Sequence, residues 1–229
     1  MNDPAPSVQR RLGAGRAVAF AALCGAAAVG CSVGQGTGRV FSEDLFVDDC
    51  YQGKFELYPT FFGANPFDDT LTIRVQRGER DILVSDGFTM LVYNVAAVRS
   101  EGLGTRLTLG LPMGVSPIGF PLPEVPNPPG ATLSLYLNNS CRSQNSVLAA
   151  VDGWVEFTKL FSGDPNEDNS DDRITDGRFE ATVVDPRHAV AGTDADGNPT
   201  YIYPEEWSSK VEGNFNFVFH RGTPAQPFP

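Results

Sequence analysis

The segment EGNFNFVF, residues 212–219, places phenylalanine at every second position. Side chains of a β-strand alternate between its two faces, so Phe215, Phe217 and Phe219 would share one buried side. The same alternation recurs after residue 50 in stretches bounded by Gly, Asp and Pro. This pattern predicts half-buried antiparallel strands. It is carried by Phe55 and Leu57; Leu71, Ile73 and Val75; Leu107, Leu109 and Leu111; Leu133, Leu135 and Leu137; and Phe179, Ala181 and Val183.

The strand pattern predicts an all-β protein, with an antiparallel β-sandwich as the expected architecture and a closed β-barrel as the alternative. Further strands are expected at residues 82–84 and 90–98, and short helices at 143–150 and 205–211. Two long loops interrupt the pattern. Residues 112–130 hold seven prolines and predict an extended crossover, or alternatively a polyproline ligand for a partner. Residues 162–177 form an acidic loop at the tip of a hairpin.

A short motif, polar-Gly-x-apolar-x-apolar, occurs four times, beginning at Gln52, Asp152, Asp176 and Glu212. Glycine in this place predicts a strand entrance with a bulge or a positive φ. In three copies the outward position between the apolar residues is a glutamate: Glu56, Glu156 and Glu180. Carboxylates lined up across neighbouring strands would suit acid–base chemistry on glycosides, whereas a solvated sheet face explains them without any function.

The formal net charge of −11 argues against some partners. Loss of residues 1–30, which contain three arginines and one aspartate, would change that charge to −13. So negative a surface repels phosphate backbones, and binding of DNA or RNA is not expected. It also repels anionic lipid head groups, so any membrane attachment needs an anchor.

The N-terminal segment has the features of an export signal. Arg10, Arg11 and Arg16 precede an uncharged run from Ala17 to Val29 that is too short to span a bilayer as a helix. We therefore expect a signal peptide at residues 1–30, a Gly-rich flexible tether at 31–39 and a single β domain at 40–229.

The sequence Ala28-Val29-Gly30-Cys31 resembles the lipobox of bacterial lipoproteins. The resemblance implies cleavage before Cys31, lipid on its sulfur and, with Ser32 following, sorting to the outer membrane of a Gram-negative bacterium. The alternative is an ordinary signal peptidase cut that leaves Cys31 free. The C-terminal sequence HRGTPAQPFP, together with PTFF at 59–62 and FTKL at 157–160, loosely resembles predicted lipoproteins of high-GC Gram-negative bacteria of the myxobacterial kind, a likeness that implies no activity.

The exported chain would keep two further cysteines, Cys50 and Cys141, because Cys24 leaves with the signal. In an oxidising compartment a disulfide between them is expected, and two free buried thiols are the alternative.

The acidic loop predicts a Ca²⁺ site. No other cofactor is expected from the sequence. Oxygen-bearing side chains stand at every second position, as in calcium-binding loops, although Asn169 and Thr175 replace the glycine and glutamate of an EF-hand. A second acidic turn could share the ion, and a solvated turn is the alternative. The candidate ligands are Asp164, Asn166, Asp168, Asp172, Asp194 and Asp196.

Tyr201, Tyr203 and Trp207 form an aromatic patch that could stack on sugars, although aromatic residues at period two more often pack in or around a core. The sequence has only two histidines and no nucleophile elbow, zinc-protease or phosphate-loop motif. We therefore expect a non-catalytic binding or structural lipoprotein of the cell envelope, with an unspecified protein or glycan partner. The alternatives are a calcium-assisted carbohydrate-binding module and an envelope hydrolase that uses paired carboxylates.

Overall fold

The computed structural model describes residues 32–78, 85–111, 130–142, 146–164, 166–193 and 199–220. The side chains of residues 32, 33 and 199–201 are outside this description. Several predicted features also lie outside the described residues: the signal peptide and Cys31, the expected strand at 82–84, most of the Pro-rich loop, and Asp194 and Asp196. The described part is dominated by strands, which confirms the all-β prediction.

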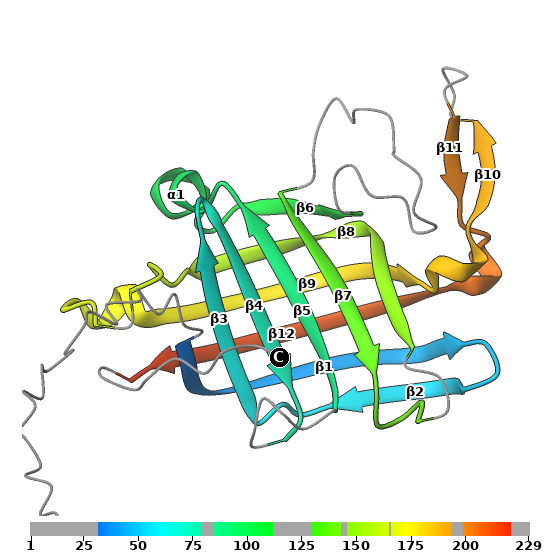
Figure 1. Cartoon of the computed structure of the whole chain (residues 1–229), viewed down its shortest axis with the longest axis horizontal. Helices are drawn as coiled ribbons and strands as arrows, with labels where there is room; N and C mark the ends of the chain where they lie inside the picture. The colour runs from blue at the N-terminus through cyan, green and yellow to red at the C-terminus, as the bar shows by residue number, and fades with distance from the viewer. Residues whose placement is uncertain are drawn as a thin grey trace, which may run out of the picture.

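The strands form two layers that cross at a steep angle (Figure 1). The front layer contains β3 (Phe61–Phe67), β4 (Thr70–Gln76), β5 (Asp86–Tyr93) and β7 (Ala131–Leu137). The back layer contains, in spatial order, β2 (Tyr51–Leu57), β1 (Ser32–Val47), β12 (Ser208–Phe219), β9 (Ile174–Val184), β8 (Val147–Lys159) and β6 (Arg106–Gly110). A separate hairpin, β10 (Val190–Thr193) and β11 (Pro199–Ile202), projects beyond them.

Hydrogen bonds join both layers into one ten-stranded sheet. The layers connect at two corners, where β1 pairs with β3 and β7 pairs with β8. Because β12 also pairs with β1, the ladder of pairings returns to its starting strand. Within the described residues every strand pair is antiparallel except β6–β7. The structure thus combines the crossed layers of an orthogonal sandwich with a continuous ladder of strand pairings.

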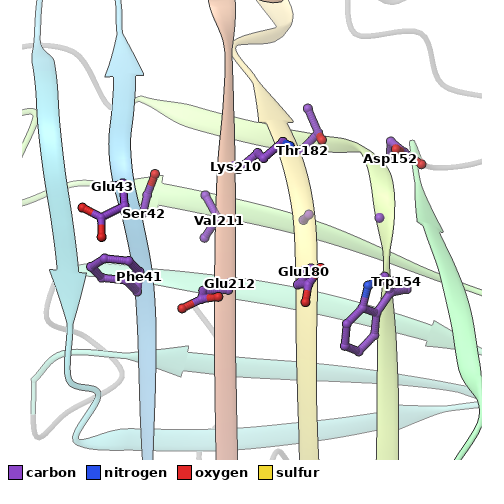
Figure 2. Close-up of a pocket in the computed structure, with 12 residues that line it drawn as sticks. Phe41, Ser42, Glu43, Asp152, Trp154, Glu180, Thr182, Lys210, Val211 and Glu212 are labelled. Atoms are coloured by element: carbon purple, nitrogen blue, oxygen red, sulfur yellow. The ribbon is translucent and has the colours of Figure 1, made fainter.

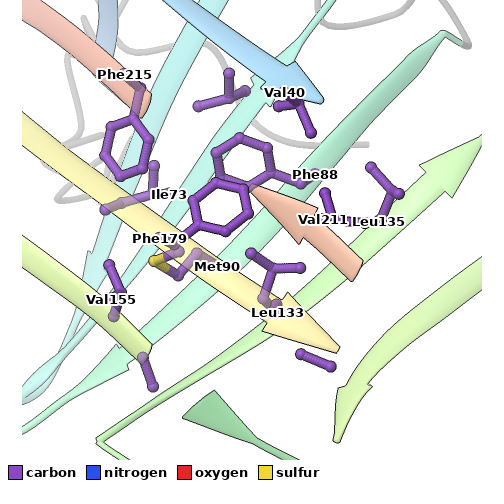
Figure 3. Close-up of a cluster of buried hydrophobic side chains, with 14 of the residues drawn as sticks. Val40, Ile73, Phe88, Met90, Leu133, Leu135, Val155, Phe179, Val211 and Phe215 are labelled. Atoms are coloured by element: carbon purple, nitrogen blue, oxygen red, sulfur yellow. The ribbon is translucent and has the colours of Figure 1, made fainter. Parts of the chain in front are cut away.

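The core fills the space between the layers with the side chains that the alternation predicts (Figure 3). The ring of Phe215 lies 5.7 Å from that of Phe88 on β5, and the ring of Phe217 lies 5.3 Å from that of Phe62 on β3. Each of these four rings is at most 1 % exposed. The apolar face of β12 therefore holds the back layer against the front layer, mainly by removing aromatic surface from water.

The prediction of a flexible tether at residues 31–39 is wrong, because β1 begins at Ser32. Gly34, Gly36 and Gly38 lie directly opposite Phe219, Phe217 and Phe215 of β12. A Cβ atom added to Gly36 would stand only 2.1 Å from the carbonyl oxygen of Asn216. The glycines thus allow two backbones to approach closely, and the composition that resembles a linker belongs to a paired strand.

Several other boundaries differ from the sequence-based expectation. The strand expected at 90–98 begins earlier and ends at Tyr93, and a short helical stretch, including α1 (Val95–Ala97), follows it. The helix expected at 143–150 is wrong in its second half, because β8 begins at Val147. At residues 205–211 a 3-10 turn, Glu205–Trp207, leads directly into β12.

The repeated glycine motif has two structural roles. Gly53 and Gly153 adopt positive φ values of 126° and 136°, and each stands beside a register shift of its ladder, as expected for a bulge. Gly177 and Gly213 have no positive φ and lie within strands β9 and β12. Phenylalanine rings of neighbouring strands cover both of these glycines, so their lack of a Cβ makes room for the core.

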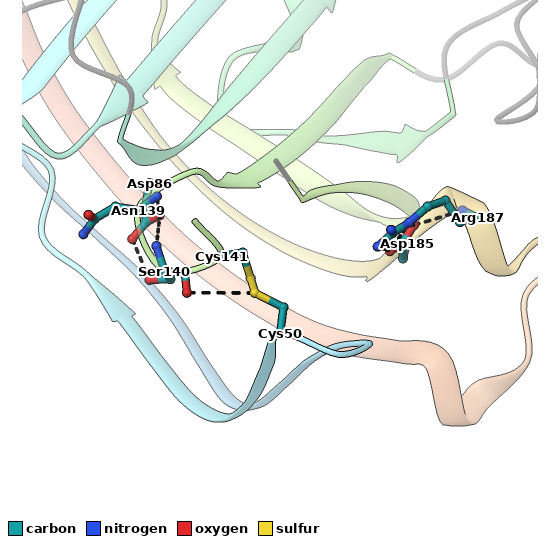
Figure 4. The surroundings of a disulfide bond; sticks show 7 residues. All are labelled: Cys50, Asp86, Asn139, Ser140, Cys141, Asp185 and Arg187. Atoms are coloured by element: carbon teal, nitrogen blue, oxygen red, sulfur yellow. Dashed lines mark hydrogen bonds and ion pairs between the residues drawn. A yellow bond between two sulfur atoms is a disulfide. The ribbon is translucent and has the colours of Figure 1, made fainter. Parts of the chain in front are cut away.

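The expected disulfide between Cys50 and Cys141 is present, with the two Cα atoms 5.6 Å apart (Figure 4). It ties the start of β2 to the turn after β7. The buried carboxylate of Asp86 stabilises the same turn, because it accepts hydrogen bonds from the backbone N–H groups of Asn139 and Ser140 and from the Ser140 hydroxyl. The covalent and polar contacts fix one corner of the back layer to the front layer.

We predict that Gly36→Ala lowers the free energy of unfolding by about 1–3 kcal/mol, because the added methyl group forces β1 away from β12. Urea denaturation measures the loss. Thr37→Ala, at the exposed neighbouring position, is the matched control and should change stability little. Equal stability of both variants and the wild type would restore the tether interpretation.

Removal of the disulfide should also destabilise the fold. The bridge closes a separation of 91 residues, and in the chain-entropy model such a loop contributes up to about 4–5 kcal/mol. We expect reductant to lower the urea midpoint of the wild type and to leave the Cys50→Ser/Cys141→Ser variant unchanged. A wild type indifferent to reductant would contradict the contribution of this bridge.

Candidate functional site

The outer face of the back layer is hollowed by a groove of about 450 Å³ across β1, β12, β9 and β8. Two bulges stand at its rim. One shifts the register of β1 against β2 between Ser42 and Leu45, and the other shifts β8 against β9 between Ala150 and Asp152. Bulges bend a strand and increase its twist, so this pair explains why the sheet is concave here.

Four side chains line up across the floor of the groove in the order Phe41, Glu212, Glu180, Trp154 (Figure 2). They come from four adjacent strands, and the register makes each the direct cross-strand neighbour of the next. We call these four residues the central row. Two carboxylates therefore lie side by side between two aromatic rings.

The carboxylates that line the groove form no ion pairs. Besides Glu180 and Glu212, the lining includes Glu43 and Asp152, with Lys210 as the one basic side chain among the lining residues. Within the described part of the chain none of these four carboxylates has an ion-pair partner within 4.0 Å. Like charges directly opposite on neighbouring strands destabilise a sheet. The lining of the groove is therefore mainly acidic, although the pKa of Arg39 in the neighbouring row is raised by Glu56 and, to a smaller extent, by Glu212, which also attracts this guanidinium.

The next row of the same face is mainly basic, because Arg39, Arg178 and Arg106 stand in it with Glu156. Arg39 pairs with Glu56 at 2.8 Å and Arg178 pairs with Glu156 at 3.1 Å. A second hollow of about 230 Å³ lies between these arginines and the central row. The guanidinium carbon of Arg106 stands 3.8 Å from the centroid of a Trp154 ring.

Hydrogen bonds lower the pKa of the Glu56 carboxyl group. The Tyr58 hydroxyl donates to Glu56 at 2.7 Å and lowers the pKa of that carboxyl group, desolvation opposes the change, and Arg39 lowers the pKa further. The hydrogen bond to Glu56 likewise raises the pKa of Tyr58, and desolvation adds to the rise. Glu56 is thus held as an anion that pairs with Arg39.

Both aromatic rings at the ends of the central row contact cationic groups of the protein itself. Arg39 lies 4.5 Å and Lys54 5.1 Å from the ring centroid of Phe41, while Arg106 covers Trp154. Cations are attracted to the negative faces of aromatic rings. The faces of both rings are thus already in contact with cationic side chains of the protein.

The three glutamates singled out from the sequence share the outer face, but the structure gives them different surroundings. Glu56 and Glu156 are engaged in ion pairs, and only Glu180 faces another carboxylate. Its partner Glu212 stands at the polar first position of the fourth motif copy. Sequence reasoning missed Glu212 and Trp154 as site residues, because their meeting depends on strand register.

The acidic loop is occupied by internal contacts. Asp172 pairs with Arg99 and also accepts a hydrogen bond from Asn169. Asp164 accepts a hydrogen bond from the backbone N–H of Asn166, which closes a local turn. Among the described residues no three His, Cys, Asp or Glu side chains group so as to hold a metal ion. Calcium binding with Asp194 and Asp196 stays a prediction, since those two residues fall outside the description.

The expected aromatic patch lies away from the groove. Trp207 stacks on His188 with ring centroids 3.9 Å apart and contacts the ring of Phe46 at 5.4 Å. The side chain of Tyr203 is partly buried, and that of Tyr201 is not described. Trp207 thus packs where β12 begins, and sugar stacking by this patch stays a prediction.

Comparison with known proteins found no match, whether to a family model, a curated protein or a solved structure. Among the described residues no helix is long and apolar enough to cross a membrane. The function is therefore inferred from the groove and from the sequence.

The opposed carboxylates give a direct test of the central row. We predict that Glu180→Gln raises the free energy of unfolding by about 0.5 kcal/mol at low salt, because it removes repulsion from Glu212. The gain should shrink in 0.5 M NaCl, which screens exposed charges. Glu156→Gln, which breaks a pair with Arg178, is the control and should not stabilise; urea denaturation measures both. A loss of stability in Glu180→Gln would contradict the proposed repulsion.

Proposed function

We propose that the protein is a non-catalytic binding lipoprotein of the bacterial cell envelope, anchored through Cys31, with its ligand site in the groove of the back layer. The observation that carries the proposal is the central row, in which Phe41, Glu212, Glu180 and Trp154 lie across a concave surface. Binding sites combine aromatic contact area with a few polar groups that orient the ligand.

Binding explains the direct opposition of Glu180 and Glu212 better than stability does. A sheet selected only for stability would place opposite charges at cross-strand positions, as the neighbouring row does with Arg178 and Glu156. Functional sites commonly retain such unfavourable contacts, because a ligand relieves them. The opposition of Glu180 and Glu212 is therefore the mark of a site.

The paired carboxylates also suggest the alternative of a glycoside hydrolase. Such an enzyme needs two carboxyl groups in contrasting environments, so that one is protonated while the other is ionised. Glu180 and Glu212 instead occupy equivalent exposed positions on adjacent strands. His188 stacks on Trp207, and His220 follows the end of β12, so neither histidine is among the groove residues. This symmetry favours binding over catalysis.

The anchor is supported by the sequence around Cys31 and is compatible with the fold. Since β1 begins at Ser32, cleavage before Cys31 would leave an intact β domain. The Cys50–Cys141 disulfide suits the oxidising conditions outside the cytoplasm. Phe41 lies ten residues after Cys31, a path of roughly 33 Å along an extended strand. The groove would then stand clear of the lipid head groups and open to soluble ligands.

We predict that the full-length chain, expressed in a Gram-negative host, incorporates an alkyne analogue of palmitate and fractionates with the outer membrane. Cys31→Ser should abolish the label. Cys24→Ser is the matched control, because that residue lies in the expected signal peptide, and it should keep the label. A soluble cytosolic product that retains residues 1–30 would contradict the proposed anchor.

A further inference from the structure

We propose that the open edge of β2 pairs with the β2 edge of a second copy of this chain, in antiparallel orientation about a two-fold axis at Phe55. The back layer would then continue from one copy into the other. The edge of β2 lies outside the lining of the groove, so this self-association goes beyond the binding function proposed above. Backbone groups without a strand partner, a self-complementary charge pattern and an exposed aromatic ring support the pairing.

The outer edge of β2 has no strand beside it in the part of the chain that the structure describes. Among the described strands β2 ends the order of the ten-stranded sheet and pairs with β1 alone. Lys54 has no cross-strand partner even there, because it lies opposite the register shift between Ser42 and Leu45. Its carbonyl oxygen instead accepts a hydrogen bond from the Tyr51 hydroxyl at 2.7 Å. The Lys54 carbonyl thus faces the open edge, and so do the backbone groups of Glu56, because alternate residues of a strand turn them to the same side.

The outward side chains of this edge complement themselves. An axis at Phe55 places Lys54 opposite Glu56 of the second copy, and Glu56 opposite its Lys54. Opposite charges at cross-strand positions stabilise a strand pair, whereas like charges destabilise it. An axis at Lys54 or at Glu56 would set like charges against each other, and an axis between residues would mix the buried and exposed faces of the strands. Only the two-fold register at Phe55 brings these opposite charges together, and in it the edge-facing backbone groups also meet.

The lysine makes the edge selective. Lysine on an edge strand ordinarily prevents strand addition, because an incoming strand would bury the ammonium group without a partner. A second copy removes this obstacle, since its Glu56 stands opposite. Glu56 already pairs with Arg39 of its own chain at 2.8 Å, so each carboxylate would lie between two cations at the junction. Exposed ion pairs contribute little affinity and mainly select the partner and the register.

Tyr58 and the length of the edge determine the expected strength. Tyr58 follows β2 with 56 % of its surface exposed, and its hydroxyl group donates to Glu56 at 2.7 Å. The proposed register places this ring opposite Gln52 of the second copy, where it would lose exposed aromatic surface. Because β2 has seven residues, its edge buries less area than a standard interface of about 1,600 Å². We expect a weak dimer, which confinement to one membrane by the proposed anchor would strengthen.

The experiment is sedimentation velocity of the mature domain between roughly 5 and 500 µM, in 150 mM NaCl to screen the overall negative charge. We expect a concentration-dependent dimer whose dissociation constant rises at least tenfold in Lys54→Glu and in Glu56→Lys. An equimolar mixture of these two variants, and the double variant Lys54→Glu/Glu56→Lys, restore opposite charges and should return the affinity to within threefold of the wild type. Lys210→Glu and Glu206→Lys reverse exposed charges away from β2 and are the matched controls, with less than a twofold change expected.

Amide hydrogen exchange locates the contact. The N–H groups of Lys54 and Glu56 should exchange more slowly at high than at low concentration in the wild type, and equally at both in the single variants. Lys54 makes no ion pair among the described residues, so Lys54→Glu should fold normally and tests the pairing even where Glu56→Lys disturbs the contact with Arg39. A wild type that stays monomeric throughout would overturn the proposal. A dimer that withstands Lys54→Glu, or that does not recover in the double variant, would overturn it as well.

Discussion

The contact between β1 and β12 is the constraint on which the rest of the structure depends. Glycines at alternate positions of one strand face phenylalanines at alternate positions of the other. The missing Cβ atoms let the backbones approach, and the rings then reach across the core to the front layer. Without this pair the back layer would divide, and the ladder that runs through both layers would not return to β1.

The contact between β1 and β12 also shapes the outer surface of the back layer. Once β1, β12, β9 and β8 are held side by side, the bulges near Gly53 and Gly153 curve them and aim the central row into the hollow. Inward positions of these strands are fixed by aromatic packing, so the outward positions are free to vary without cost to the core. The protein pairs charges across one outward row and leaves like charges together in the next. A stable interior thus supports a locally unfavourable exterior, which is the usual relation between a fold and its site.

The sequence predicted those parts of the fold that local patterns determine. Alternating Leu and Phe residues located six strands, and two cysteines in a chain expected to be exported predicted their bridge. The sequence-based prediction failed at Gly34, Gly36 and Gly38, because glycine enrichment suggests a linker unless the strand opposite is known. That period-two spacing was nevertheless a signal, since it matches the spacing of Phe215, Phe217 and Phe219. The central row was beyond local reasoning, because four strands and their registers must be known before Trp154 and Glu212 become neighbours.

The strand at the N-terminus also changes how an anchor would act. A flexible tether would let the domain turn freely, whereas β1 would carry the lipid at the end of a paired strand. Ser32 pairs with Ala64 of β3, and the acidic loop reaches the same end, where Gly163 lies against Pro66. Carboxylates of that loop and of the β3–β4 turn would then face the bilayer, and anionic head groups would repel them. Lipid insertion would hold the domain close while this repulsion would oppose its lying flat, so the two forces together would keep the groove turned toward the solvent.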